Sequence, residues 1–179
     1  EPALKFASLL SSDGAILVMA TAMTLKLPKF KNLMERYGRD AVPVPCPGLV
    51  ELVEAGETDG PRVRRKLLEL LDPYLKRPVK AVVLGCTHYV FLKDALRACL
   101  PPGVALVDGN EGTARQLKNR LKQKGLLCAP QPEASNRRGD IVFLSTAADA
   151  DVPARMRRQF FRALEALDTA CISPTDTIE

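Results

Sequence analysis

The sequence of 179 residues is poor in several residue types that particular functions require. It has one histidine, no tryptophan and five cysteines, and no two cysteines form a C-x-x-C pair. Closed zinc sites need four ligands at short paired spacings, so the sequence does not favour a metal site. Three tyrosines and six phenylalanines offer little aromatic surface, and the net charge is a mild +5. Without a binding motif beside these residues, we expect no nucleic-acid partner.

Long apolar runs are missing as well. No stretch approaches the roughly 20 apolar residues that span a bilayer, and no secretory signal opens the chain, so we expect no membrane association. An odd number of cysteines without such a signal is typical of a reducing compartment, which predicts a cytoplasmic protein. The chain begins at Glu1-Pro2 without methionine and runs directly into a helix-like pattern. We therefore expect that it was cut from a longer protein.

Short apolar runs alternate with helical patterns along the chain. Continuous apolar runs that end in turn residues predict buried strands at 15–20, 41–45, 80–85, 104–109 and 140–146. Apolar residues at helical spacing predict helices at 28–38, 48–56, 59–75, 89–100, 110–125 and 152–167. Strands followed by helices imply parallel βαβ units, whose sheet is covered on both faces. The predicted fold class is therefore α/β, a parallel sheet flanked by helices.

The turn "GCTH" carries the most informative chemistry, because sites in parallel sheets form at the C-terminal ends of strands. Cys86 follows a predicted strand, and Thr87 and His88 lead into a helix. An imidazole beside a thiol can take up its proton, and a threonine hydroxyl can hold a carboxylate oxygen. The plainer alternative is that Cys86 is a small buried hydrophobe and His88 a helix cap. We interpret Cys46 in "PCPG" as structural, because no activating partner stands beside it.

Other polar residues at strand ends remain ambiguous from their positions alone. Thr21 and Thr24 in "ATAMT" lie after a predicted strand, but hydroxyls there often cap the next helix. Glu54, near the end of a short predicted helix, fits either a cleft or a solvated surface. Asp108, at the end of "VALVD", is equally open to both interpretations.

These motifs together resemble bacterial glutamate racemases. "VVLGCTHYVFLKDAL" is similar to the family's second cysteine signature, usually LGCTHYPLL. The resemblance extends in order over nearly the whole chain, through "EPALKFA", "ILVMATAMT", "VPCPGLVELVEAGE", "VALVDGNEGTARQL" and "GDIVFLSTAAD". By this resemblance the chain is identified as the C-terminal two-thirds of an aspartate/glutamate racemase-like protein. The CTHY signature is highly specific, and the other segments support it.

The resemblance implies cofactor-independent interconversion of L- and D-glutamate, which supplies peptidoglycan synthesis and so cell-wall biogenesis and cell shape. In the family, two cysteines face each other across the substrate's α-carbon, and Cys86 matches the second. His88 matches the assisting histidine, whereas Thr87 and Glu54 match substrate-site residues. Thr21 and Thr24 would lie near the substrate. Glutamate is the expected small-molecule partner, and a homodimer is an assembly to be tested.

The sequence also departs from the family pattern. No A-C-N-T segment with a first catalytic cysteine occurs, and Met23, Leu27, Val90 and Gly109 replace common family residues around the substrate turns. We therefore expect the isolated chain to be inactive, either as a fragment or as a degenerate relative. An aspartate racemase and a non-catalytic amino-acid-binding or regulatory protein remain alternatives.

The resemblance divides the chain into three parts. Residues 1–106 would form the α/β domain that bears the second cysteine. Residues 107–167 would be the C-terminal part of the other racemase domain, without its N-terminal strands. Residues 168–179 would be a tail.

Overall fold

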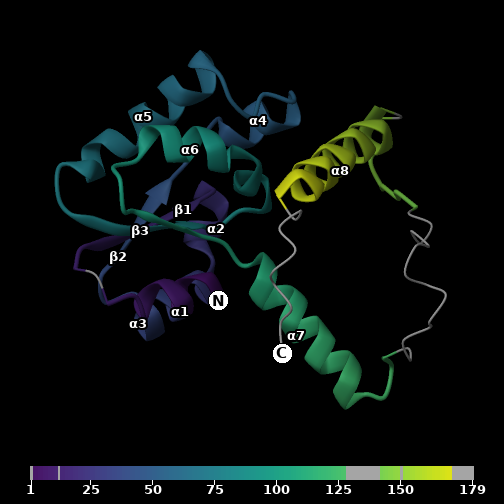
Figure 1. Ribbon diagram of the computed structural model, residues 1–179, viewed down its shortest axis with the longest axis horizontal. Helices are drawn as coiled ribbons and strands as arrows, with labels where there is room; N and C mark the ends of the chain where they lie inside the picture. The colour runs from purple at the N-terminus through teal and green to yellow at the C-terminus, as the bar shows by residue number, and fades with distance from the viewer. Residues whose placement is uncertain (1, 12, 128–141, 150, 171–179) are drawn as a thin grey trace. The chain divides into compact units, whose positions relative to one another are not determined.

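The computed structural model describes residues 2–11, 13–127, 142–149 and 151–170 (Figure 1). The chain forms two compact units, Glu1–Cys128 and Ala129–Glu179. The first unit continues past residue 106 and contains the sheet together with all the residues predicted for the site. The division into racemase domains at residues 106 and 107 stays a prediction.

A four-stranded parallel sheet forms the centre of the first unit. Its strands are β1 (Ala15–Ala20), β2 (Ala41–Pro45), β3 (Val79–Leu84) and β4 (Ala105–Val107), in the order β2-β1-β3-β4. Leu17 of β1 lies between Val42 of β2 and Val82 of β3. The predicted parallel α/β fold is therefore confirmed. β4 is shorter than predicted, because Asp108 and Gly109 already turn into the next helix.

Helices cover both faces of this sheet (Figure 1). One face carries α4 (Leu49–Glu54), α5 (Pro61–Leu75) and α6 (Lys93–Cys99), and the other carries α1 (Pro2–Ser8) and α3 (Pro28–Tyr37). Also present are α2 (Ala22–Lys26), the 3₁₀ helix η1 (Thr87–Leu92) and α7 (Asn110–Gln123). The helix predicted at 89–100 is thus divided into η1 and α6. The short helix α2 was not predicted.

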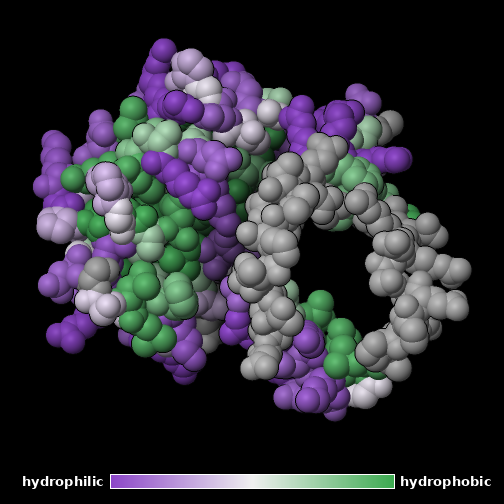
Figure 2. Space-filling view, in the orientation of Figure 1, coloured by the Kyte–Doolittle hydropathy of each residue, from purple (hydrophilic) through white to green (hydrophobic). Residues whose placement is uncertain are grey.

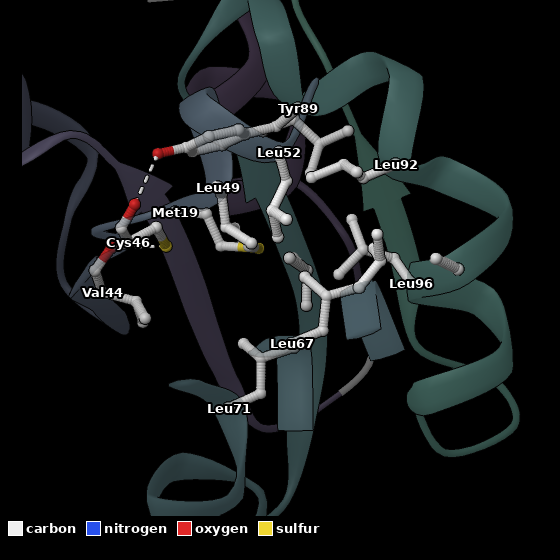
Figure 3. Packing of buried hydrophobic residues seen from close by; sticks show 14 of the residues in the cluster. Met19, Val44, Cys46, Leu49, Leu52, Leu67, Leu71, Tyr89, Leu92 and Leu96 are labelled. Carbon is white, nitrogen blue, oxygen red and sulfur yellow. Dashed lines mark hydrogen bonds between the residues drawn. The ribbon is translucent and has the colours of Figure 1, made fainter. Parts of the chain in front are cut away.

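The alternation of side chains along the strands divides the core into two layers. Leu17 and Met19 of β1 point into the larger layer, where they meet Leu67 of α5 and Leu96 of α6 (Figure 3). Ile16 and Val18 point to the other side, towards α1 and α3. Each fully buried leucine contributes about 1.5–3 kcal/mol relative to an exposed one. These two layers fix the strand ends on which the candidate site is built.

Hydrophobic side chains also reach the surface of the first unit, as the green area in Figure 2 shows. The large exposed ones include Phe6, Leu9, Met23 and Leu27. No helix among the described residues combines the length and apolar character that crossing a membrane requires.

The second unit contains the helix α8 (Asp151–Ala170), which continues past the predicted end at residue 167 and into the predicted tail. The strand predicted at 140–146 is wrong for its described residues, since 142–149 contain no strand. Phe143 instead contacts the rings of Phe160 and Phe161, with centroids 5.5 and 6.3 Å away. Val142 and Leu144 are exposed. An apolar run pairs as a strand only where a neighbouring strand is available, which periodicity alone does not reveal.

Candidate functional site

The backbone leaves β3 through a tight contact with β1 that requires glycine. The Gly85 N–H donates to the Met19 carbonyl at 2.8 Å, and a Cβ atom at Gly85 would lie 2.7 Å from that same oxygen. Any larger residue would therefore displace the turn. Gly85 thus fixes the position of Cys86 at the C-terminal end of the sheet, as the strand-end rule predicts.

A thiol, an imidazole and a carboxylate are in contact at this turn. Cys86 Sγ lies 3.7 Å from His88 Nδ1, and His88 Nε2 lies 2.6 Å from Glu54 Oε1. The roles of the two ring nitrogens depend on the tautomer: when Nε2–H donates to the Glu54 carboxylate, Nδ1 of the neutral ring can accept the thiol proton. The structure therefore brings three of the predicted residues together in one chain of contacts, which we call the relay.

Tyr89 holds this turn in place. Its ring is completely buried, and its hydroxyl donates to the Cys46 carbonyl at 3.3 Å (Figure 3). Its backbone N–H donates to the Cys86 carbonyl at 3.1 Å. Tyr89 therefore ties η1, which bears His88, to the turn that precedes α4, which bears Glu54. Sequence reasoning did not single out this residue, although it stands beside His88 in the quoted signature.

Cys46, at the end of β2, has a very different environment from Cys86. It is 2% exposed, and its thiol donates to the Val44 carbonyl at 3.2 Å. Burial raises the pKa of the Cys46 thiol to about 12, and negative charge on Cys86 adds to the rise. A thiol that stays protonated at neutral pH is a poor base and a poor nucleophile. These observations agree with a structural role for Cys46.

The two threonines at the end of β1 have different positions. Thr21 caps α2, because its hydroxyl oxygen accepts from the Thr24 N–H at 3.2 Å. The two hydroxyl oxygens are 2.9 Å apart. Thr24 lines a cleft together with Cys86 and Thr87, whereas Thr21 is not part of that lining. Thr21 therefore positions Thr24. Helix capping, the alternative role considered for the two threonines, is the role that Thr21 has.

The cleft beside Cys86 has a volume of about 1130 Å³ and lies within the first unit. Its walls include the turn after β4, whose Asp108 the sequence left open as a cleft residue, and residues of α1 and α3, which the sequence did not indicate as neighbours. At that turn Asp108 pairs with Lys93 at 2.5 Å and accepts from the Asn110 N–H at 2.8 Å. Burial works against the charged form of Asp108, but these two hydrogen bonds outweigh it and lower its pKa.

The described residues contain no group of three or more His, Cys, Asp or Glu side chains that could hold a metal ion. A partly exposed thiol beside an imidazole, on the wall of a cleft with two threonine hydroxyls, can transfer a proton to and from a small bound molecule.

Comparison with protein families gives a match that covers most of the first unit. The family model for Asp/Glu/Hydantoin racemases matches residues 1–117. Among curated proteins, glutamate racemase of Clostridium perfringens is 42% identical over 154 residues, which are 85% of this chain and 57% of that protein. Glutamate racemase of Clostridium kluyveri is 49% identical over 122 residues, 68% of this chain and 48% of that protein. The chain thus spans about half the length of the curated relatives it matches.

Solved structures agree with this match. Escherichia coli glutamate racemase, in complex with L-glutamate and the activator UDP-MurNAc-Ala, aligns with a TM-score of 0.67 and 28% identity. The alignment covers 92% of this chain and 59% of that one. Glutamate racemase from Thermus thermophilus, in complex with β-chloro-D-alanine, aligns with a TM-score of 0.54 and 34% identity over 74% of this chain and 47% of that one.

Proposed function

The chain belongs to the Asp/Glu/hydantoin racemase family, and from this premise we propose that it supplies one half of a glutamate racemase site. Cys86 is the acid–base residue for one face of the substrate's α-carbon. His88 takes and returns the thiol proton, and Glu54 orients the imidazole. The single observation that carries this proposal is the contact of Cys86, His88 and Glu54 at the end of β3.

The chemistry explains why a thiol with a proton acceptor is suited to this role. The α-proton of an amino acid is weakly acidic, so its removal needs a positioned base in a site that excludes water. His88 can hold the thiol proton while Cys86 acts as thiolate. Thr87 and Thr24 line the same cleft and offer hydroxyl donors for the substrate carboxylate. No cofactor is required for such a proton transfer.

Inversion at carbon needs a second proton donor on the opposite face. Of the three thiols among the described residues, Cys86 alone lines the cleft, since Cys46 is buried and Cys99 lies at the end of α6. We therefore expect the chain by itself to exchange the α-proton of glutamate without inverting it. The second proton donor would be a residue other than these three thiols.

Proton exchange can be measured separately from inversion. The purified chain is incubated with L-glutamate in deuterated water, and the α-proton signal is followed by NMR while optical rotation is recorded on the same sample. We expect the α-proton signal to decay and the rotation to stay constant. Cys86→Ser should stop the exchange. Cys99→Ser is the matched control and should leave it unchanged.

The outcomes separate the alternatives. Loss of rotation in step with exchange would show that the chain is a complete racemase. Faster exchange with L-aspartate than with L-glutamate would favour the aspartate racemase alternative. Binding of glutamate without exchange would contradict the proposal and favour an amino-acid-binding protein.

The biological role that follows is the supply of D-glutamate for peptidoglycan in the cytoplasm, and therefore for cell-wall biogenesis and cell shape. What supports it is the similarity to curated glutamate racemases over most of the chain. A homodimer is an assembly that size-exclusion chromatography with light scattering would test.

A further inference from the structure

The relay in the first unit has the order nucleophile, base and orienting acid. Cys86 Sγ contacts one ring nitrogen of His88 at 3.7 Å, and Glu54 contacts the other at 2.6 Å. A base that reaches the nucleophile on one side and an orienting carboxylate on the other is the arrangement of covalent acyl-transfer sites on unrelated folds. The three residues come from η1, its preceding turn and α4, which pack together in one unit.

Racemisation and attack on a carbonyl carbon need different arrangements of side chains. Racemisation needs proton donors on two opposite faces of a carbon atom. Attack on a carbonyl carbon needs a nucleophile and a base on the same side. All three side chains named for the second reaction, Cys86, His88 and Glu54, lie in the first unit, Glu1–Cys128.

The surroundings of Cys86 leave room for a small acyl group. The cleft wall near the strand ends contains Ala20, Leu84 and Val90, with Thr24 and Thr87 as polar neighbours. Cys86 itself is partly exposed, so a carbonyl carbon can reach the sulfur. The side chains of His88 and Glu54 are 28% and 45% exposed, which leaves a path for the water that must release the product.

We propose that Cys86 accepts the acyl group of an activated ester or thioester of a small carboxylic acid and passes it to water. The sulfur forms a bond to the carbonyl carbon while the bond to the leaving alkoxide or thiolate breaks. The thiol proton passes to His88 and then to the leaving group. His88 next takes a proton from water, which attacks the enzyme thioester. The carbon–sulfur bond breaks, the carboxylic acid leaves and the thiol is restored.

p-Nitrophenyl acetate tests this activity with the intact chain. Release of p-nitrophenolate is followed by absorbance, and the acetylated cysteine is located by mass spectrometry of peptides. We expect acetylation of Cys86 at early times and repeated turnover thereafter. His88→Asn should lower the rate about 100-fold, in the range of general-base contributions, and added imidazole should restore part of it. Glu54→Gln should lower the rate by a smaller factor.

Cys99→Ser is the control, because that thiol lies outside the relay and contacts the Arg64 carbonyl at 3.9 Å. It should leave the rate unchanged. Circular dichroism of each variant confirms that it is folded. Equal rates for the unchanged chain and His88→Asn would overturn the proposal, as would acetylation of Cys99 in place of Cys86. A thioester that persists after one turnover would overturn the transfer to water. The assay contains no glutamate, so its result is independent of the proton-exchange experiment.

Discussion

Cys46 and Cys86 follow the two strands that flank β1, yet they have opposite chemical environments. Both lie one or two residues beyond a strand of the same parallel sheet. Cys46 points into the larger core layer, and its thiol donates a hydrogen bond to the Val44 carbonyl. Cys86 lies on the wall of the cleft and contacts an imidazole. A strand-end position therefore makes a residue available for function, and the neighbouring side chains decide whether it is used.

The difference is produced by the residues that follow each cysteine. After Cys46 come Pro47, Gly48 and then Leu49, which begins α4. Leu49 is fully buried, and Cys46 is buried beside it in the same core layer. After Cys86, an exposed threonine and a half-buried histidine precede the buried Tyr89. Tyr89 then connects the two turns through its bond to the Cys46 carbonyl. The buried cysteine thus supports the turn that holds the accessible one.

The largest expected effect is in alkylation by iodoacetamide at pH 8. The thiolate is the reactive form, and a thiol whose pKa is raised from an ordinary value of about 8.5 to about 12 is about 2000-fold less ionised at that pH. We expect Cys46 to react at least about 1000-fold more slowly in the folded protein than in strong urea, and the accessible Cys86 to react much faster than Cys46, as measured by peptide mass spectrometry. In strong urea the two rates should converge. Similar rates in the folded protein would contradict the comparison.

The next largest effect is a loss of stability at alkaline pH that depends on Cys46. The folded thiol keeps its proton to a pKa of about 12, whereas the unfolded thiol loses it near about 8.5. The contribution is fully present below about pH 8.5 and is lost as pH rises towards 12, at about 1.4 kcal/mol per pH unit. Urea unfolding at pH 7.5 and 10 should show a decrease of about 2 kcal/mol that is absent in Cys46→Ala. Equal decreases in both proteins would refute this assignment.

The sequence reveals the strands well because parallel strands are covered on both faces. Residues 16–20 are all buried, which gives a continuous apolar run rather than an alternating one. α2 escapes prediction because five residues carry too little periodicity. The run at 140–146 has the same composition as a strand, but Phe143 packs against α8 instead. Apolar runs thus predict burial more reliably than they predict pairing.

The candidate site is less visible from the sequence, since most of its contacts join distant segments. The strand-end rule finds Cys86, and the adjacent His88 follows from it. Glu54, however, is 34 residues from its partner His88, and Cys46 is 43 residues from Tyr89. The position of Glu54 left its role ambiguous, and the family resemblance made it a site candidate. The role of Tyr89 is visible only in the folded structure, where its hydroxyl contacts the Cys46 carbonyl.

Tyr89→Phe tests the connection between the two cysteine turns. The change removes one hydroxyl and leaves the Cys46 carbonyl without its donor, which should lower the free energy of unfolding by about 1 kcal/mol. If Cys46 reacts through local opening, its alkylation should accelerate about fivefold. Alkylation of Cys86 should slow, because η1 holds His88 less firmly. Urea unfolding and the same peptide assay measure both effects. Parallel changes at the two thiols would argue against a connection through Tyr89.

The smallest effect is expected for Asp108→Asn, at the turn after β4. The folded pKa of Asp108 lies below the ordinary value of about 3.9, so its ion pair with Lys93 stabilises the fold above that pH. The contribution disappears as pH falls through the folded pKa. We expect a loss of at most about 1 kcal/mol at pH 7, from urea unfolding, which becomes smaller as the pH falls below the ordinary pKa of an aspartate. Asp94→Asn is the matched control, because the Asp94 side chain is 88% exposed beside Arg97 and should contribute nothing measurable.

Neither change should alter alkylation of Cys46 or Cys86, because the two cysteine turns depend on contacts from β1, α4 and η1. A shift in either rate would show that the turn after β4 also supports the relay.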